Sequence, residues 1–202
     1  MDLKQILKEI RNTKIAMNLP KKSVTIFGSA RLKEDSPYFE KAYLLAKRLA
    51  DAGYTIVTGG GGGIMLASNK GAFSSNKEQS VGFNIILPRE QKVNDYVTTS
   101  LLFSRLEIRK VALIEKSSHF VVFPGGYGTL DELFEILVLV QTKLKKADIY
   151  LYGTAFFSPL VDFIKNSLLE ERVISKEDLN LFCLTDEIDE IFNGIVNGSQ
   201  KS

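Results

Sequence analysis

The sequence is poor in the residues that build disulfide frameworks and thiolate or imidazole metal sites. Its 202 residues include one cysteine (Cys183), one histidine (His119) and no tryptophan. A single cysteine cannot close an internal disulfide, which is typical of a reducing compartment, so we expect the protein in the cytoplasm. One histidine and one cysteine cannot make a tetrahedral zinc site, and we expect no metal and no cofactor. Composition alone leaves a carboxylate-held Mg²⁺ open.

Long apolar runs and a strong excess of one charge are also missing. No stretch approaches the roughly 20 apolar residues that cross a bilayer. Residues 1–14 carry charges throughout, unlike the apolar centre of a signal peptide. The formal net charge of +2 indicates no dedicated surface for nucleic acid. We therefore expect neither a membrane nor a nucleic-acid partner.

What the chain does contain is an alternation of short apolar strands and helices. Strands are predicted at residues 23–27, 55–58, 80–87, 119–123 and 149–152, and helices at 2–12, 37–51, 64–73, 105–116, 129–144, 156–169 and 186–195. Residues 88–95 are expected to form a loop, and 96–103 fit either structure. The alternation predicts a single α/β domain with a doubly wound, mainly parallel, Rossmann-like sheet. This domain spans 21–197, after an N-terminal helix and lead-in (1–20) and before a flexible tail (198–202).

Glycines gather where three of the expected strands end. Gly28-Ser29 follows the first strand, the run 59–63 follows the second, and residues 124–129 (PGGYGT) follow the strand at 119–123. In a parallel sheet, ligands bind outside the carboxyl ends of the strands. Consecutive glycines before a helix expose backbone N–H groups at the positive end of the helix dipole, which favours an anion, most often a phosphate. Tight turns and close helix packing are the alternative, but two such loops on one edge favour the phosphate.

The spacing of these glycines limits which phosphate-containing ligands are expected. Neither run contains G-x-G-x-x-G, so the dinucleotide fingerprint is missing, and no G-x-x-x-x-G-K-[ST] of a P-loop occurs. A mononucleotide or a sugar phosphate is the simplest remaining ligand.

The charged residues near these loops are the candidates for chemistry. Thr129 and Glu132 have the T-x-x-E spacing of a capping box, which would make both structural. Alternatively, Glu132 lies beside the ligand and holds ribose hydroxyls or orients a water. Arg109 and Lys110 are expected at the start of a helix on the same edge, although either would also fit a solvated helix face. His119 opens a strand and is interpreted as structural, and Cys183 as a small buried apolar residue.

The two glycine motifs together resemble a known family. Residues 59–65 (GGGGGIM) and 124–132 (PGGYGTLDE) resemble the GGGxGxM and PGGxGTxxE signatures of the LOG (Lonely Guy) family, and Arg109-Lys110 matches its RK pair. LOG proteins are cytokinin riboside 5′-monophosphate phosphoribohydrolases, and many relatives carry the label "lysine decarboxylase-like". The resemblance runs from about Val24 to Leu184. Leu66 and Leu106 depart from residues common in the family, which puts the base preference in doubt.

The resemblance implies a homodimer that hydrolyses a nucleoside 5′-monophosphate, AMP or a cytokinin riboside monophosphate, to free base and ribose 5-phosphate. It implies that Arg109 and Glu132 are the catalytic pair. The expected substrate- and phosphate-binding residues are Gly28, Ser29, Gly60, Gly61, Gly63, Met65, Lys110, Pro124, Gly125, Gly126, Tyr127, Gly128 and Thr129.

Other functions remain open at this point. Lysine decarboxylation is disfavoured, because it requires pyridoxal phosphate on a lysine with a partner for its ring nitrogen, and a phosphate cradle alone shows neither. A non-catalytic nucleotide or molybdenum-cofactor carrier of the same fold is the main alternative, and a nucleosidase with a broader choice of base is another. The apolar helix at 133–140 fits a subunit interface or the domain core equally well.

Overall fold

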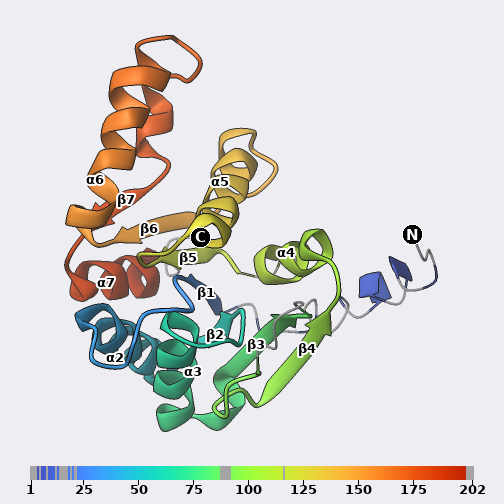
Figure 1. The fold of residues 1–202 in the computed structure, drawn as a ribbon. Coiled ribbons are helices and arrows are strands. Elements are labelled where there is room, and N and C mark those ends of the chain that lie inside the picture. Colours follow the sequence, from blue (N-terminus) through green and yellow to red (C-terminus); the bar gives the residue numbers. More distant parts are fainter. Residues whose placement is uncertain are drawn as a thin grey trace.

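The computed structural model describes residues 22–86, 92–115 and 117–198, together with residues 4, 6, 7, 9–11, 13, 18 and 20. Within these ranges it forms one seven-stranded, wholly parallel sheet with helices on both faces (Figure 1). The strands are β1 (Ser23–Phe27), β2 (Thr55–Thr58), β3 (Ser80–Ile85), β4 (Thr99–Phe103), β5 (His119–Val122), β6 (Asp148–Tyr152) and β7 (Cys183–Thr185). The predicted fold class is confirmed.

The helices alternate with these strands. They are α2 (Pro37–Asp51), α3 (Ile64–Ser75), α4 (Leu106–Glu115), α5 (Tyr127–Gln141), α6 (Thr154–Phe163) and α7 (Ile188–Gly198), with short helical turns η1 (Lys77–Gln79), η2 (Ile164–Leu169, a π-helix) and η3 (Glu177–Asn180). The first of these helices begins as predicted: Ser36 caps α2 by accepting a hydrogen bond from the Tyr38 amide, and Pro37 follows it.

The strand order is β4-β3-β2-β1-β5-β6-β7. The chain winds outward in one direction from β1 to β4 and then returns to pair β5 with the other edge of β1. The order therefore reverses between β1 and β5, which is the position where open α/β sheets bind their ligands. The loops that follow these two strands meet there.

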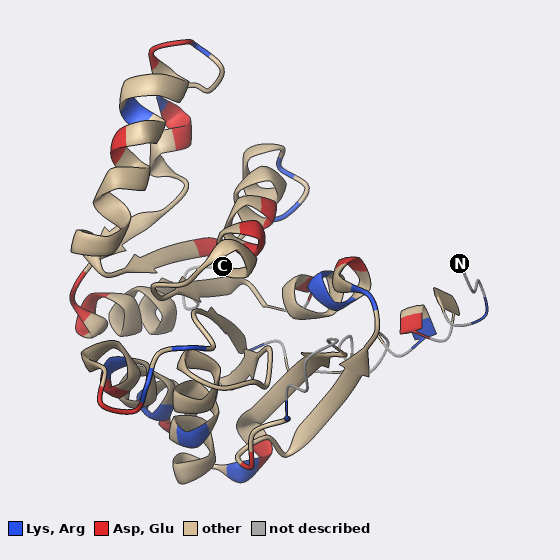
Figure 2. Ribbon diagram, in the orientation of Figure 1, with Lys and Arg blue, Asp and Glu red and all other residues tan. Residues whose placement is uncertain are grey.

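Two apolar layers enclose the sheet. One contains Val24 and Ile26 of β1 packed against α2, α3 and α7, and the other contains Phe27, Val57 and Phe120 packed against α4, α5 and α6. Because both faces are covered, the strands are almost free of charge, and Figure 2 shows the charged residues concentrated on helices and loops. None of the helices in the described ranges is long and apolar enough to cross a bilayer.

Several sequence predictions need correction. Residues 99–103 of the ambiguous stretch form β4, an edge strand that is buried on one face only, and β7 was not predicted at all. The helix predicted at 129–144 begins two residues earlier, at Tyr127, and α6 gives way to a π-helix before residue 169. Cys183 is only half-buried, since β7 is the other edge strand.

The chain ends and one loop are described only in part. Residues 4, 6, 7 and 9–11 of the helix predicted at 2–12 are helical, and the rest of that stretch lies outside the described residues. Residues 87–91, which belong to the end of a predicted strand and the start of a predicted loop, also lie outside them, as do residues 199–202 of the predicted tail. At the other end α7 continues through Gly198.

Candidate functional site

The loops after β1 and β5 are joined at the switch point of the sheet. The Ser29 amide donates a hydrogen bond to the Pro124 carbonyl, at 3.0 Å. Gly125 follows in a position where only glycine fits, because a Cβ there would lie 2.2 Å from Thr129 Oγ1 and 3.0 Å from the Ser29 nitrogen. The sequence therefore places a backbone-lined loop, with little room for side chains, at the carboxyl ends of the central strands.

This loop leads into an open helix N-terminus. The N-cap of α5 is Gly126, and no side chain caps it. The first turn of any α-helix has amides without partners inside the helix, and its dipole is positive there. Residues 126–128 are exposed, with Tyr127 94% exposed, so the start of this helix lies at the surface. The arrangement suits an anion such as a phosphate.

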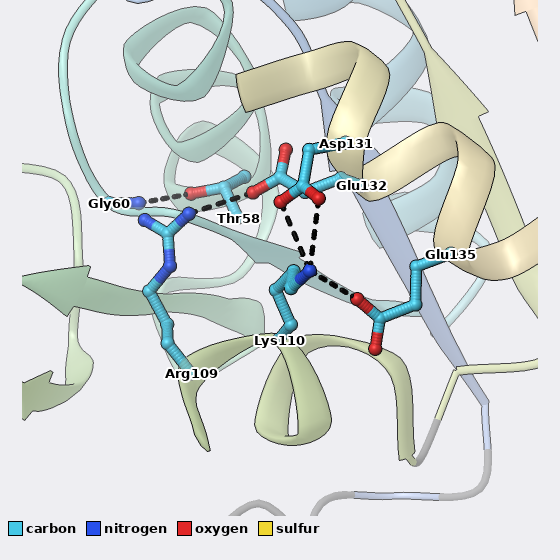
Figure 3. A network of polar contacts seen from close by, with 7 residues as sticks. All are labelled: Thr58, Gly60, Arg109, Lys110, Asp131, Glu132 and Glu135. Atoms are coloured by element: carbon cyan, nitrogen blue, oxygen red, sulfur yellow. Dashed lines mark hydrogen bonds and ion pairs between the residues drawn. The ribbon is translucent and has the colours of Figure 1, made fainter. Parts of the chain in front are cut away.

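The capping-box interpretation of Thr129 and Glu132 is wrong. The helix has already begun at Tyr127, so Thr129 lies inside its first turn rather than at the N-cap. Glu132 does not reach back to the helix start. Its Oε1 accepts a 2.8 Å hydrogen bond from Arg109 Nη2, which makes an ion pair between α4 and α5 (Figure 3).

The Arg109–Glu132 pair is buried at the edge of the glycine run. The two side chains are 13% and 10% exposed. The guanidinium lies beside Gly59, where a Cβ would be 3.5 Å from Nη1 and 2.7 Å from Met65 Sδ. The buried Nε of Arg109 has no hydrogen-bond partner within the described part of the chain. A buried donor without a partner is costly to the folded state.

The environment of Glu132 changes its protonation. The pKa of Glu132 is raised from 4.5 to about 7: burial is the largest cause, Asp131 and Glu135 also raise it, and Arg109 and Lys110 oppose the rise. A carboxyl group with a pKa near neutrality exchanges protons readily at physiological pH. Groups with a pKa shifted in this way are typical of sites of acid–base chemistry.

Lys110 lies next to Arg109 but contacts other carboxylates. Its Nζ is 3.1 Å from both carboxylate oxygens of Asp131 and 2.6 Å from Glu135 Oε2. Burial lowers the pKa of Lys110, but the hydrogen bonds to Glu135 and Asp131 raise it above its ordinary value. Figure 3 shows the amine between Asp131 and Glu135, two of the three acidic side chains of α5.

The glycine run after β2 is held by a buried polar network that the sequence did not reveal. Thr58 Oγ1 accepts from the Gly60 amide at 2.9 Å and donates to Asn69 Oδ1 at 2.7 Å. Asn94 Nδ2 donates to Asn69 Oδ1 at 3.0 Å and to the Gly61 carbonyl at 2.9 Å. The one feature of the sequence that could have indicated this network is Asn69, a polar residue on the face of α3 that packs against the sheet.

Gly60 has a conformation that requires glycine. Its φ is +68°, and a Cβ would lie 2.0 Å from Asn84 Oδ1. The next helix starts close by, with Gly63 as the N-cap of α3 and the Ile64 amide donating to the Ser29 carbonyl at 3.0 Å. Ser29 therefore contacts the loops after both β2 and β5, and the glycine segments converge as predicted.

His119 lies away from this site. It is the first residue of β5, so it lies at the amino ends of the strands, whereas residues 124–129 follow their carboxyl ends. Its Nδ1 is 3.0 Å from Asp148 Oδ2. It is 6% exposed, which agrees with a structural interpretation.

Comparison with known proteins shows the family and the fold of the chain. A family model described as "Possible lysine decarboxylase" matches residues 65–195. Rice (Oryza sativa subsp. japonica) "Cytokinin riboside 5′-monophosphate phosphoribohydrolase LOG" is 29% identical over 146 residues, which cover 71% of this chain but only 60% of the rice protein. Another rice protein, "Probable cytokinin riboside 5′-monophosphate phosphoribohydrolase LOG4", is 24% identical over 183 residues, covering 89% of this chain and 79% of that protein.

Solved structures share the fold at lower identity. The "Moco Carrier Protein from Chlamydomonas reinhardtii" superposes with a TM-score of 0.62 at 19% identity, covering 91% of this chain and 100% of that one. At this identity the similarity shows the fold alone. The family model spans most of the chain, including Arg109, Glu132 and the second glycine motif. The chain therefore belongs to the LOG family, whose model carries the decarboxylase description.

Proposed function

We propose that the protein hydrolyses the N-glycosidic bond of a nucleoside 5′-monophosphate, AMP or a cytokinin riboside monophosphate, to free base and ribose 5-phosphate. The observation that carries this proposal is the buried Arg109–Glu132 pair, positioned between the glycine run after β2 and the open N-terminus of α5. The phosphate binds to the amides of residues 125–129, with Gly28 and Ser29 beside them.

Glu132 acts on the reacting bond. Cleavage breaks the bond between ribose C1′ and the base nitrogen, water supplies the new C1′ oxygen, and the water proton ends on the departing base. C1′ gains oxocarbenium character on the way, which a nearby carboxylate stabilises. The ionised Glu132 is suited to this role and to accepting the proton of the water.

Arg109 holds the carboxylate and the ligand together. A guanidinium stays protonated in proteins, so Arg109 does not serve as a proton donor in the reaction. Its Nη2 fixes Glu132, and its Nη1 lies beside Gly59 of the glycine run, where it contacts the nucleotide. Binding the phosphate at a distance from C1′ lets that interaction orient the sugar for attack.

Base release from AMP and from isopentenyladenosine monophosphate, followed by chromatography, tests this function. We expect hydrolysis by the wild-type protein and a loss of about 100-fold or more in kcat for Glu132→Gln, which keeps the shape of the side chain. Glu107→Gln is the matched control, because Glu107 is an exposed carboxylate of α4. Binding of AMP without base release from either nucleotide would refute the hydrolase and favour a carrier of the same fold.

We also propose that the protein is a homodimer, as the family resemblance implies. The apolar residues at 133–140 divide between the domain core and a proposed subunit interface. Leu133 and Ile136 are fully buried in the domain, while Phe134 and Val138 are 39% and 52% exposed. The exposed pair lies on α5, whose N-terminus forms part of the site. Association through this helix face would bury both residues.

A further inference from the structure

Five charged side chains meet where α4 faces α5. Arg109 and Lys110 come from α4, and Asp131, Glu132 and Glu135 come from the first turns of α5. Figure 3 shows them as two adjacent pairings, one around each cation. When all five are ionised, three negative charges face two positive ones, so the cluster is one positive charge short of neutrality.

The amine of Lys110 is fully occupied by this cluster. An ammonium group has three donors. The Nζ of Lys110 lies within hydrogen-bonding distance of both Asp131 oxygens and of Glu135 Oε2, and its side chain is only 16% exposed. A lysine that binds a phosphate would present its amine to the open loop instead. Here the amine is directed at α5, beyond the first turn that forms the anion site.

The two carboxylates that Lys110 contacts also interact electrostatically with Glu132. Asp131 and Glu135 act on it from its own helix, and Arg109 and Lys110 act on it from α4. Arg109 is already committed to Glu132. The negative charges of Asp131 and Glu135 are therefore left to Lys110, and without it they would disfavour a third carboxylate beside them.

We propose that Lys110 is a positioning residue that neutralises Asp131 and Glu135 and thereby keeps Glu132 ionised, rather than a ligand of the substrate phosphate. This role rests on the proposed function only in so far as ionised Glu132 is the reactive form. The charge relation itself is a property of the unliganded protein. It assigns to the lysine of the RK pair a role distinct from that of the arginine.

The direct test is the titration of Glu132 by NMR in protein with ¹³C-labelled glutamate carboxyl groups, with the signal assigned by its loss in Glu132→Gln. We expect Lys110→Met to raise the midpoint by about one pH unit, as expected for removal of one nearby opposite charge. Lys110→Arg should leave it unchanged. Glu135→Gln, which keeps the contact between Lys110 and Asp131, should lower it, and this second variant tests the proposal even if Lys110→Met does not fold.

The pH profile of hydrolysis provides the second readout. With the midpoint moved from about 7 to about 8, the ionised fraction at pH 7 falls about five-fold, and kcat should fall equally. At pH 9 the two proteins should differ by less than two-fold. The double variant Lys110→Met/Glu135→Gln has the net charge of the wild-type cluster and should recover the wild-type pH profile. If Lys110 were instead a ligand of the phosphate, the second substitution would not restore activity.

The outcomes separate the two proposals. The role of Lys110 would be overturned if Lys110→Met left the titration midpoint of Glu132 unchanged. It would also be overturned if Lys110→Met raised the KM for AMP ten-fold at pH 9 and the double variant did not recover it. A shifted midpoint in a protein that releases no base from either nucleotide would leave the role of Lys110 intact and refute the hydrolase instead.

Discussion

The protonation of Glu132 predicts that this carboxylate destabilises the folded protein. Its pKa rises from 4.5 to about 7 on folding, chiefly because burial disfavours the charged form. The folded state therefore binds the proton more tightly than the unfolded chain does. This contribution to stability is fully present below pH 4.5 and is lost as the pH rises through 7.

The magnitude follows from the size of the shift. Each unit of pKa difference corresponds to about 1.4 kcal/mol, so the contribution lost above pH 7 is on the order of 3 kcal/mol. The glutamine of Glu132→Gln resembles the protonated acid at every pH, so this variant does not lose that contribution to stability as the pH rises. Its side-chain oxygen can still accept a hydrogen bond from Arg109, so the packing of the pair is retained.

Urea denaturation of the two proteins at pH 5 and pH 8 measures this effect. The free energy of unfolding of Glu132→Gln, relative to wild type, should rise by about 2–3 kcal/mol between these pH values. Titration of other groups cancels in the comparison, and Glu107→Gln should show no such pH-dependent gain. A difference that is the same at both pH values would show that Glu132 titrates normally, and the acid–base role derived from its burial would have to be abandoned.

Two further changes test the glycine run and the exposed face of α5. Gly60→Ala meets both a positive φ and a contact at 2.0 Å from Asn84, whereas Gly53→Ala meets only a positive φ of +86° with open space around it. In urea denaturation, we expect Gly60→Ala to lower the free energy of unfolding by about 2–4 kcal/mol and Gly53→Ala to lower it by about 1 kcal/mol. Equal losses in the two variants would refute the close packing of Gly60. Light scattering should give twice the 22.5 kDa chain mass for the wild type. Phe134→Glu/Val138→Glu should reduce this mass to that of a monomer, and an unchanged dimer would place the interface elsewhere.

The fold and the convergence of Arg109 with Glu132 could be predicted from the sequence because they depend on order along the chain. In a parallel sheet, a helix between two strands begins at the carboxyl edge, so α4 had to present Arg109 beside the loop after β5. The same logic brought Gly28-Ser29 to that loop. These inferences needed no knowledge of any individual side-chain contact.

The remaining features depend on contacts that spacing does not encode. The T-x-x-E pattern at Thr129 fits a capping box, and only the tertiary pairing of Glu132 with Arg109 decides against it. Edge strands β4 and β7 carry mixed patterns because one neighbour or one face is missing. The partners of Lys110 and Asn69 lie on other elements, so their roles emerged only from the three-dimensional arrangement.

The hydrogen bond between Ser29 and Pro124 has a consequence for how the protein acquires its site. The two residues lie far apart in the chain, and they come together only when β5 pairs with β1. Contacts of long sequence separation form late, because a long segment must be ordered before they stabilise anything. Until β5 has been synthesised, β1 presents an unpaired apolar edge that can associate with other chains. Completion of the loop at residues 124–129 and protection of that edge are therefore the same folding event.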